Sequence, residues 1–408
     1  MSQNQKPVLT PIDTALDMLL AQLPQVCEQE TLPLEQASGR ALAEDYVSSA
    51  HVPPHASSAM DGYALRTSDL DGESASLKIT QRIAAGEVGS PLGVGEAARI
   101  FTGAPIPEGA DAVAMQENCS VAEGQLTLKK PVVGENVRQA GDDILSGAMV
   151  LAKGCRLRPQ DLGLLASIGV EKVKVKRKLR VTLLTTGNEL VRPGTRLKAG
   201  QIYNSNYYTL YSLLESLHVD VLDGGIVEDD FEETSKALLA AATVSDCIIS
   251  TGGVSVGEED HVKAAVEKEG VLDLWKLAIK PGKPLACGKI GDCQFFGLPG
   301  NPVSAFITFA LVVRPCLLTM LGCEQVGPQT YKLAAGFKSS ISGERQEYLR
   351  ANLVNDEQGN VALMPLSNQG SGVATSLNQS DGLVIIPPYT SIAIGDNLTF
   401  IPFSEILN

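Results

Sequence analysis

The hydrophobic pattern changes at about residue 179, where short apolar runs begin to alternate with amphipathic segments. The runs are rich in Val, Ile and Leu, as in strands covered on both faces, and the segments between them carry apolar residues at helical spacing. This alternation predicts right-handed crossovers and a doubly wound α/β sheet. The expected strands are 179–185, 219–222 and 247–250, and the expected helices are 206–217 and 232–242.

A hairpin and a helix follow this module. Two apolar runs, 285–290 and 293–298, are separated by Gly291 and Asp292, which predicts a β-hairpin. The lysine-rich stretch 276–284 is expected to be a loop stiffened by its prolines, and a helix is expected from about Pro302.

The rest of the chain predicts three further domains. Residues 12–23 form one amphipathic helical pattern, and residues 158–168 form another. Most of the sequence between them consists of short β-like runs separated by Gly, Pro and Asp. Beyond residue 327 the pattern is again strand-like. The predicted domains are a discontinuous elongated helical and β domain (1–45 and 147–178), a β-rich inserted domain (46–146), the α/β domain (179–327) and a small C-terminal β-barrel-like domain (328–408).

Length and composition agree with several globular domains. The composition, 44% apolar and 20% charged, is that of a globular protein, and 408 residues are more than a single hydrophobic core usually holds. The formal net charge of -14, without a long basic run, argues against nucleic acid or a membrane surface as a partner. An anionic small ligand would need local positive groups, such as lysines, loop amides or a divalent cation.

The eight cysteines contain no C-x-x-C pair, and several lie in apolar runs, which favours buried free thiols and a reducing, cytoplasmic location. The first residues have no apolar signal-peptide core. The most hydrophobic stretch, 305–321, is interrupted by Arg314 and Pro315, so no membrane span is expected.

A glycine-rich loop follows the strand at 247–250. Gly252, Gly253 and Gly257 permit positive φ and close backbone approach, so main-chain N–H groups can point at an oxyanion. A helix expected from about Glu259 adds the positive end of its dipole. This loop is therefore predicted to bind a phosphate or another oxyanion.

Residues 253–257 also match the G-x-S-x-G nucleophile elbow around Ser255. A hydrolase triad needs a histidine downstream, and the sequence offers only His261, too close for the order found in that fold. The oxyanion-binding interpretation is therefore preferred.

Acidic residues follow three of the predicted strands. Because ligands of open α/β sheets bind beyond the carboxyl ends of the strands, Glu189, Asp229 and Asp260 are expected on one rim. Oxygen-only ligands suit Mg²⁺ rather than zinc. The simpler alternative is that such residues cap helices, and it applies most to Asp229, which precedes a helix. Lys276, Lys280 and Lys283 follow downstream as candidate anion contacts.

Seven short motifs occur in an order that resembles the molybdopterin molybdenumtransferase (MoeA) family, also found as the E domain of gephyrin. They lie at 60–64 (MDGYA), 99–105 (RIFTGAP), 109–111 (GAD), 186–190 (TGNEL), 251–257 (TGGVSVG), 280–284 (KPGKP) and 297–304 (GLPGNPVS). Each is weak alone, but together and in order they are specific.

The resemblance implies the last step of molybdenum cofactor synthesis, in which adenylylated molybdopterin and molybdate give the metal-loaded cofactor and AMP with the help of Mg²⁺. It also implies a homodimer with each active site between the α/β domain of one subunit and the second domain of the other. Contacts with the molybdopterin adenylyltransferase and with cofactor-accepting enzymes are expected partners.

The resemblance assigns roles position by position. Glu189, Asp229 and Asp260 would hold the cation, and Lys276 and Lys280 would contact phosphate or molybdate. Asp61 and Thr102 would position the pterin or oxyanion from the other subunit. The remaining functional positions are Asp143, Arg350 and the cofactor-binding residues Gly252, Gly253, Ser255, Gly257 and Pro299.

Some assignments leave alternatives open. Asp142 adjoins Asp143, and Asp230 adjoins Asp229, so the register of each pair is ambiguous. The loop ends in Glu258-Glu259-Asp260 where relatives commonly have Asp-Tyr-Asp, and the family's serine loop is matched only loosely around Ser371.

Two rival functions are an adenylyltransferase-like enzyme, which shares the glycine loop, and a non-catalytic pterin carrier or scaffold. The inserted domain and the β tail argue against the first, and the second is expected to need additional linker and domain sequence.

Overall fold

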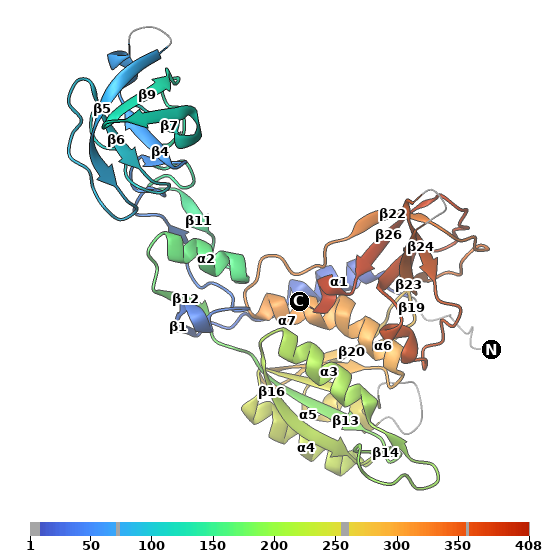
Figure 1. The fold of residues 1–408 in the computed structure, drawn as a ribbon. Coiled ribbons are helices and arrows are strands. Elements are labelled where there is room, and N and C mark those ends of the chain that lie inside the picture. Colours follow the sequence, from blue (N-terminus) through green and yellow to red (C-terminus); the bar gives the residue numbers. More distant parts are fainter. Residues whose placement is uncertain (1–8, 71–73, 254–260, 356–358, 408) are drawn as a thin grey trace.

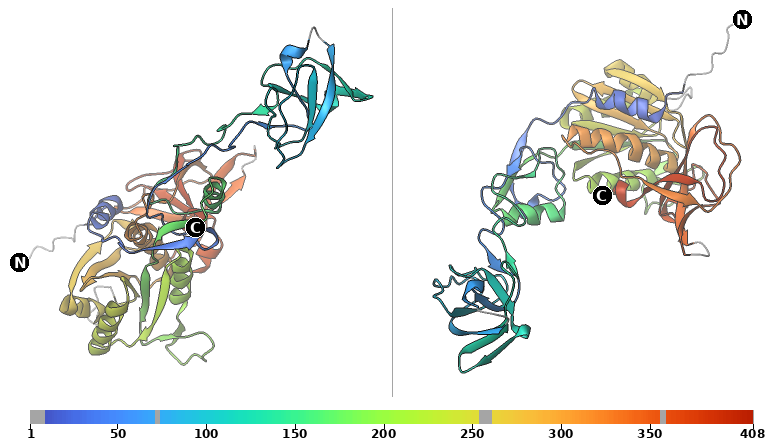
Figure 2. Two further views of the ribbon diagram at one scale, coloured as in Figure 1. Left: turned by 90° about the vertical axis from the view of Figure 1, so that its left-hand side faces the viewer. Right: turned by 90° about the horizontal axis from the view of Figure 1, so that it is seen from above.

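The structure is a computed structural model that describes residues 9–70, 74–253, 261–355 and 359–407. Figure 1 shows an elongated molecule in which a β-rich domain stands away from a larger body, joined to it by a slender connecting region. The other two views in Figure 2 show the same separation. The predicted fold class, a multidomain mixture of α/β and β units, is confirmed.

Two distant segments of sequence build the connecting region. Strand β1 (Gln29–Pro33) pairs antiparallel with β12 (Lys172–Lys176), and helix α2 (Pro159–Ser167) packs beside them (Figure 1). Two short pairs lead outward to the inserted domain: β2 (Tyr46–Val47) with β11 (Met149–Leu151), and β3 (Ser57–Ser58) with β10 (Val137–Arg138). Helix α1 (Ile12–Leu20) shares a core with the α/β domain instead, because its buried residues pack with those of α7.

The inserted domain is a six-stranded sheet with the order β7-β4-β6-β5-β9-β8. Apolar residues on both faces of this sheet form two cores. Its strands are β4 (Gly62–Leu65), β5 (Ser74–Ile83), β6 (Glu96–Ile100), β7 (Ala112–Met115), β8 (Cys119–Ala122) and β9 (Gln125–Lys129).

The α/β domain has a six-stranded sheet with the order β16-β13-β17-β21-β20-β18. Helices cover both faces, as the predicted doubly wound sheet requires: α3, α6 and α7 on one core and α4 and α5 on the other. Its strands are β13 (Arg180–Thr186), β16 (Asp220–Val227), β17 (Cys247–Thr251), β18 (Val271–Lys276), β20 (Pro284–Ile290) and β21 (Cys293–Leu298). Its helices are α3 (Ser205–Ser216), α4 (Phe231–Val244), α5 (His261–Glu269), α6 (Pro302–Thr308) and α7 (Arg314–Met320), and a π-helical turn, Phe309–Val313, joins the last two.

The hairpin prediction is confirmed, but the hairpin is not an appendage. Strand β21 pairs parallel with β17 and antiparallel with β20, so it is a central strand of the sheet. The stretch 276–284 is not wholly a loop, because Lys276 ends β18 and β19 (Ile279–Lys280) pairs with the C-terminal domain.

The C-terminal domain contains a closed barrel of five strands in the order β23-β24-β22-β26-β25. The barrel is closed because its first strand, β23, also pairs with its last strand, β25. Closure removes sheet edges and agrees with the predicted barrel-like domain. Its elements are β22 (Tyr331–Ala335), β23 (Gln346–Asn355), β24 (Val361–Pro365), β25 (Gly382–Ile386) and β26 (Asn397–Pro402), with short helices α8 (Thr375–Asn378) and α9 (Ser404–Leu407).

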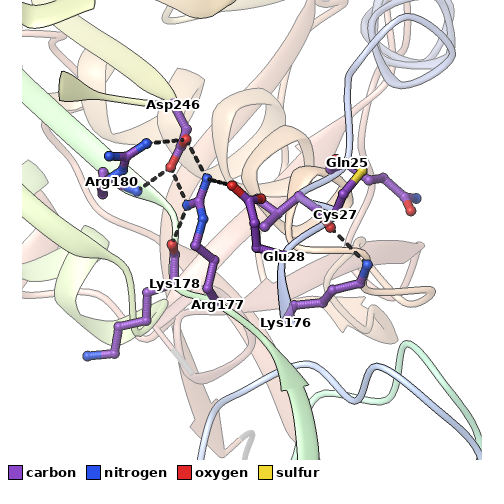
Figure 3. A network of polar contacts seen from close by, with 9 residues as sticks. Gln25, Cys27, Glu28, Lys176, Arg177, Lys178, Arg180 and Asp246 are labelled. Carbon is purple, nitrogen blue, oxygen red and sulfur yellow. Dashed lines mark hydrogen bonds and ion pairs between the residues drawn. The ribbon is translucent and has the colours of Figure 1, made fainter. Parts of the chain in front are cut away.

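A charged network joins the connecting region to the α/β sheet (Figure 3). Arg177 makes two hydrogen bonds to the Asp246 carboxylate, at 2.7 and 2.8 Å, and a longer one of 3.4 Å to Glu28. Arg180 donates to the same carboxylate through its backbone N–H at 2.8 Å. Asp246 therefore fixes the point where the chain enters the α/β domain.

One described helix, Pro302–Met320, is long and apolar enough to span a membrane, but 94% of its apolar window is buried inside the protein. The eight cysteines are all free, and five of them, including Cys247 and Cys316, are buried as predicted. Burial raises the pKa of both thiols, so they behave as core residues.

Candidate active site

The carboxyl ends of four parallel strands, β16, β13, β17 and β21, meet at one edge of the α/β sheet. The loops that follow them border a cleft of about 730 Å³, whose other side comes from the turn before β20 and from the C-terminal barrel domain. The residues around the cleft are Thr186, Gly187, Glu189, Asp229, Gly252, Gly253, Lys280, Pro281, Gly282, Lys283, Pro284, Pro299, Gly300, Asn301, Ser304, Arg345, Gln369, Gly370 and Ser371. This is where an open α/β sheet binds its ligand.

Two carboxylates, Glu189 and Asp229, line the cleft on the side of β13 and β16. Their loops are fastened to each other by Asn188, whose backbone N–H donates to Asp229 Oδ2 at 3.2 Å while its side-chain oxygen accepts from Asp229 N at 3.1 Å. The helix cap is the neighbouring residue: Asp230 Oδ1 accepts from the N–H groups of Glu232 and Glu233 at 2.9 and 3.0 Å. In this pair, the cap is Asp230, and Asp229 is free to face the cleft.

The floor of the cleft is made of close backbone contacts. Gly252 has φ +94°, and a Cβ there would lie 2.6 Å from the Thr186 carbonyl, so only glycine fits. Thr251 Oγ1 donates to the Pro299 carbonyl at 3.1 Å, and Asn206 donates to the Gly300 carbonyl at 2.7 Å. These bonds hold the loop after β21 against the end of β17 and the first turn of α3.

Three cationic side chains line the cleft: Lys280, Lys283 and Arg345. Lys280 Nζ lies 3.0 Å from Glu347 Oε1. Lys283 has no carboxylate within 4.0 Å among the described residues, so its charge is available to a ligand. Cations and carboxylates thus line the same cleft, which suits a ligand that is itself anionic and carries a divalent cation.

Arg350 does not line the cleft but lies behind its wall. Its side chain is fully buried, and it donates to Ser376 Oγ at 3.1 Å and to the Gly370 carbonyl at 3.3 Å. Burial lowers the pKa of this guanidinium. The Ser371 carbonyl in turn accepts from Val303 N at 3.0 Å at the start of α6, so Arg350 helps to shape the loop that borders the cleft.

Asp61 and Thr102 do not line this cleft and belong to the inserted domain, which stands away from the α/β and C-terminal domains (Figure 1). They contact each other: Thr102 donates to Asp61 Oδ1 through both its N–H and its hydroxyl, each at 2.8 Å. These two bonds, the backbone one first, lower the pKa of Asp61. Thr102 thus holds the Asp61 side chain as an ionised carboxylate on an exposed surface.

Two other predicted residues also lie outside the cleft. Asp143 is exposed in the connection to the inserted domain, where its N–H donates to the Val52 carbonyl. Lys276 ends β18 and accepts a hydrogen bond from Thr10 through its carbonyl. Ser255, Gly257 and Asp260 lie outside the described residues. Within the described ranges, no group of three or more His, Cys, Asp or Glu side chains could hold a metal ion.

Sequence reasoning missed Arg345, and it included Gln369 only in the loosely matched serine loop around Ser371. Arg345 directly precedes β23, and the pairing of β23 with β19 of the α/β domain brings this part of the C-terminal domain to the cleft. Ser304 and Asn301 lay within a quoted motif, which was the available signal for them.

The fold and the cleft first define a class: a multidomain protein whose doubly wound α/β domain presents carboxylates and cations beyond the carboxyl ends of its strands. Family models then identify the three parts of the chain. Residues 10–169 match the MoeA N-terminal region (domain I and II), residues 182–319 the probable molybdopterin binding domain, and residues 331–403 the MoeA C-terminal region (domain IV).

Whole-chain comparisons agree. A molybdopterin molybdenumtransferase of Haemophilus influenzae is 40% identical over 401 residues, covering 97% of this chain and 99% of that protein. One of Bacillus subtilis is 34% identical over 373 residues, covering 88% and 86%. The solved structure of the molybdopterin biosynthesis moeA protein of Pyrococcus horikoshii superposes with a TM-score of 0.82 at 30% identity, covering 97% of this chain and all of that one.

The chain therefore belongs to the molybdopterin molybdenumtransferase (MoeA) family. It is an enzyme, a transferase of molybdenum cofactor biosynthesis.

Proposed function

We propose that the protein inserts molybdenum from molybdate into adenylylated molybdopterin, with Mg²⁺-dependent release of AMP. The observation that carries this proposal is the cleft at the sheet edge, where Glu189 and Asp229 and the cations Lys280, Lys283 and Arg345 line one space of about 730 Å³. That size is within the range of small-molecule and cofactor sites. A substrate with phosphates, a pterin and a metal partner requires both kinds of charge.

The cleft offers oxygen donors of the type that a hard divalent cation prefers, although the described residues contain no group of three carboxylates that could hold it. Glu189 and Asp229 supply carboxylate oxygens, and the buried Thr186 hydroxyl at the cleft has no hydrogen-bond partner among the described residues. Oxygen donors of this kind suit Mg²⁺. Glu189 and Asp229, with Asp260 as a further proposed ligand, would hold the ion, which when bound polarises the phosphoanhydride as a Lewis acid and offsets local negative charge.

The positive residues and the glycine loop would bind the oxyanions. Lys280, Lys283 and Arg345 can donate charge-assisted hydrogen bonds to molybdate or phosphate. Pro299 and Gly300 precede the N-terminus of the continuous helix that starts at Pro302, which adds a favourable dipole for an anion. The role proposed for Lys276 is a further contact to the same anions.

We propose further that the working form is a homodimer in which Asp61 and Thr102 of one subunit complete the cleft of the other. This is supported by the distance of the inserted domain from the cleft of its own chain, together with the preformed Asp61–Thr102 pair (Figures 1 and 2). The eight free cysteines support work in the reducing cytoplasm. Its proposed partners are the adenylyltransferase that supplies the substrate and the enzymes that accept the product.

The test is a reconstituted reaction with purified protein, adenylylated molybdopterin, molybdate and Mg²⁺. AMP release and reconstitution of a cofactor-free molybdoenzyme are measured, with EDTA as the control. Molybdate-dependent AMP release that EDTA abolishes is the expected result. Tight pterin binding without turnover would instead indicate a carrier or scaffold, and formation of adenylylated molybdopterin from ATP would indicate an adenylyltransferase.

A further inference from the structure

The Asp61–Thr102 pair sits where two neighbouring strands of the inserted domain meet. Asp61 immediately precedes β4, and Thr102 follows the end of β6, and these strands pair antiparallel with Gly62 opposite Ile100. The Asp61 side chain is exposed, and both of its hydrogen bonds go to Oδ1. An exposed carboxylate on such a connection needs additional support if it is to keep one orientation.

The guanidinium of Arg99 supplies that support, because it contacts the residue next to each member of the pair. Arg99 Nη1 donates to the carbonyl of Gly62, which follows Asp61, at 3.0 Å. Its guanidinium carbon lies 4.7 Å from the ring centre of Phe101, which precedes Thr102. It also lies 5.1 Å from the ring centre of Tyr63. A planar guanidinium can make such stacking and forked contacts at once, and an ammonium cannot.

Gln116 closes the arrangement. Its backbone N–H donates to the Asp61 carbonyl at 3.1 Å, and its side-chain oxygen accepts from Arg99 Nη2 at 2.5 Å. The carbonyls of Asp61 and of the next residue, Gly62, are therefore both tied to one Arg99–Gln116 unit. Arg99 has no carboxylate within 4.0 Å among the described residues, so no ion pair neutralises its charge. This charge also helps to lower the pKa of Asp61.

We infer that Arg99 is a positioning residue of the transferase reaction, which acts through Asp61 and Thr102 by fixing the backbone that carries them. This inference rests on the proposed function. Groups that meet a substrate must be held within fractions of an ångström, and the residues that hold them contribute to the rate without touching the reacting atoms.

Arg82 provides a matched control. It is the partner of Arg99 in the β5–β6 register, and its guanidinium carbon lies 4.5 Å from the centre of the same Phe101 ring. It is exposed, and it donates no hydrogen bond to the residues around Asp61 in the described structure. Removing Arg82 therefore takes an equal charge from the same ring and leaves the Gly62 and Gln116 contacts in place.

The experiment compares Arg99→Gln, Arg99→Lys and Arg82→Gln in the Mg²⁺-dependent AMP-release assay. We expect Arg99→Gln to lower kcat about 10- to 100-fold, the size of effect that small displacements of reacting groups produce. Arg99→Lys keeps the charge but loses the fork, so it is expected to recover only part of the rate. Arg82→Gln is expected to stay within about twofold of the wild type. In the Arg99 variants the loss should fall on kcat rather than on the KM for molybdate, since the cations proposed to bind molybdate are Lys280, Lys283 and Arg345 of the other subunit.

A double-mutant cycle separates positioning from a general structural role. In an Asp61→Asn background, adding Arg99→Gln should lower kcat by less than about a further threefold, because Arg99 acts through Asp61. Additive losses, a loss in Arg82→Gln equal to that in Arg99→Gln, or an unchanged rate in Arg99→Gln would each overturn the inference.

If Arg99→Gln proves unfolded by circular dichroism, Gln116→Leu gives the same test. This substitution removes the side-chain oxygen that accepts from Arg99 Nη2 and leaves the hydrogen bond from Arg99 Nη1 to the Gly62 carbonyl in place. For the inference to stand, the loss of kcat that it causes must likewise disappear in the Asp61→Asn background. Wild-type turnover in the same assay tells a failure of this inference apart from a failure of the proposed function.

Discussion

Asn188 and Asp229 exchange two backbone-to-side-chain hydrogen bonds, of 3.2 and 3.1 Å, across the loops that follow β13 and β16. The exchange joins the loop of Glu189 to the loop of Asp229, so the two carboxylates at the cleft are held as one unit. Hydrogen bonds that orient the side chains of a metal site commonly tune the affinity of that site for the metal.

Asn188→Ala should therefore weaken the response to Mg²⁺. Losing the acceptor for the Asp229 N–H frees the loop, and we expect the Mg²⁺ concentration for half-maximal AMP release to rise about 10-fold. The matched control is Asp230→Ala, which removes a helix cap and should lower the free energy of unfolding by about 1 kcal/mol without changing the Mg²⁺ requirement. Equal Mg²⁺ responses in Asn188→Ala and the wild type would contradict the proposed role of this pair.

Glu189→Gln should strongly lower turnover while leaving the elution volume of the protein unchanged. The substitution removes a charge from an exposed position at the cleft and keeps the side chain's shape. We expect AMP release to fall by about 10²-fold or more, because a metal's Lewis-acid effect amounts to several kcal/mol. Size-exclusion chromatography should show an unchanged elution volume, and full activity would remove Glu189 from the site.

Mixing two impaired variants tests whether the site is shared between subunits. Asp61→Asn and Glu189→Gln would each keep only a small residual rate alone, but a mixed dimer would contain one site with both intact residues. After exchange of subunits in an equal mixture, about a quarter of the wild-type rate is expected, since half of the dimers are mixed and each has one good site. No recovery, with exchange demonstrated by a tag, would place Asp61 outside the site of the partner subunit.

Lys283→Met should raise the KM for molybdate. Lys283 lines the cleft and is not engaged by a carboxylate in the described structure, whereas Lys280 is already paired with Glu347. A rise of about 10-fold is expected, the size of one charge-assisted hydrogen bond, and the salt dependence of KM should weaken as well. Lys289→Met is the control and should leave KM unchanged, because Lys289 lies near the far end of β20, the strand that begins directly after Lys283.

Asp246 should make the protein's stability depend on pH in the acid range. Burial raises the pKa of this carboxyl, but hydrogen bonds from Arg177 and Arg180 outweigh it and lower the pKa from 3.8 to about 2. A lowered pKa means that the stabilisation is complete above the unfolded value and is lost as pH falls from about 4 towards 2. The difference corresponds to about 2 kcal/mol.

Asp246→Asn should remove this contribution at neutral pH and flatten the stability curve below pH 4. Urea unfolding followed at pH 7 and pH 3 measures both effects. Glu28→Gln, which alters a more exposed partner of the same Arg177 (Figure 3), should have the smaller effect. A pH dependence that persists in Asp246→Asn would show that another group controls acid unfolding.

Much of the fold could be predicted from the sequence because local patterns encode it. Apolar runs such as 247–250 alternate with helical segments, so the doubly wound sheet, its carboxyl edge and the residues just beyond each strand followed directly. The place of Glu189 and Gly252 at the cleft is of this kind. The role of β21 as a central strand was not readable, because a hairpin gives the same local signal at the edge of a sheet as within it.

The amino-acid sequence by itself determined the elements, the family resemblance and the chemical types at the site, since spacing and residue type act over a few neighbours. Only the tertiary structure decided which of two adjacent residues faces the cleft and which distant ones join it. Asp229 and Asp230 look alike in sequence, and one hydrogen-bond pattern assigns the cap to Asp230. Arg345 reaches the cleft through the pairing of β19 with β23, a long-range contact that no local pattern contains.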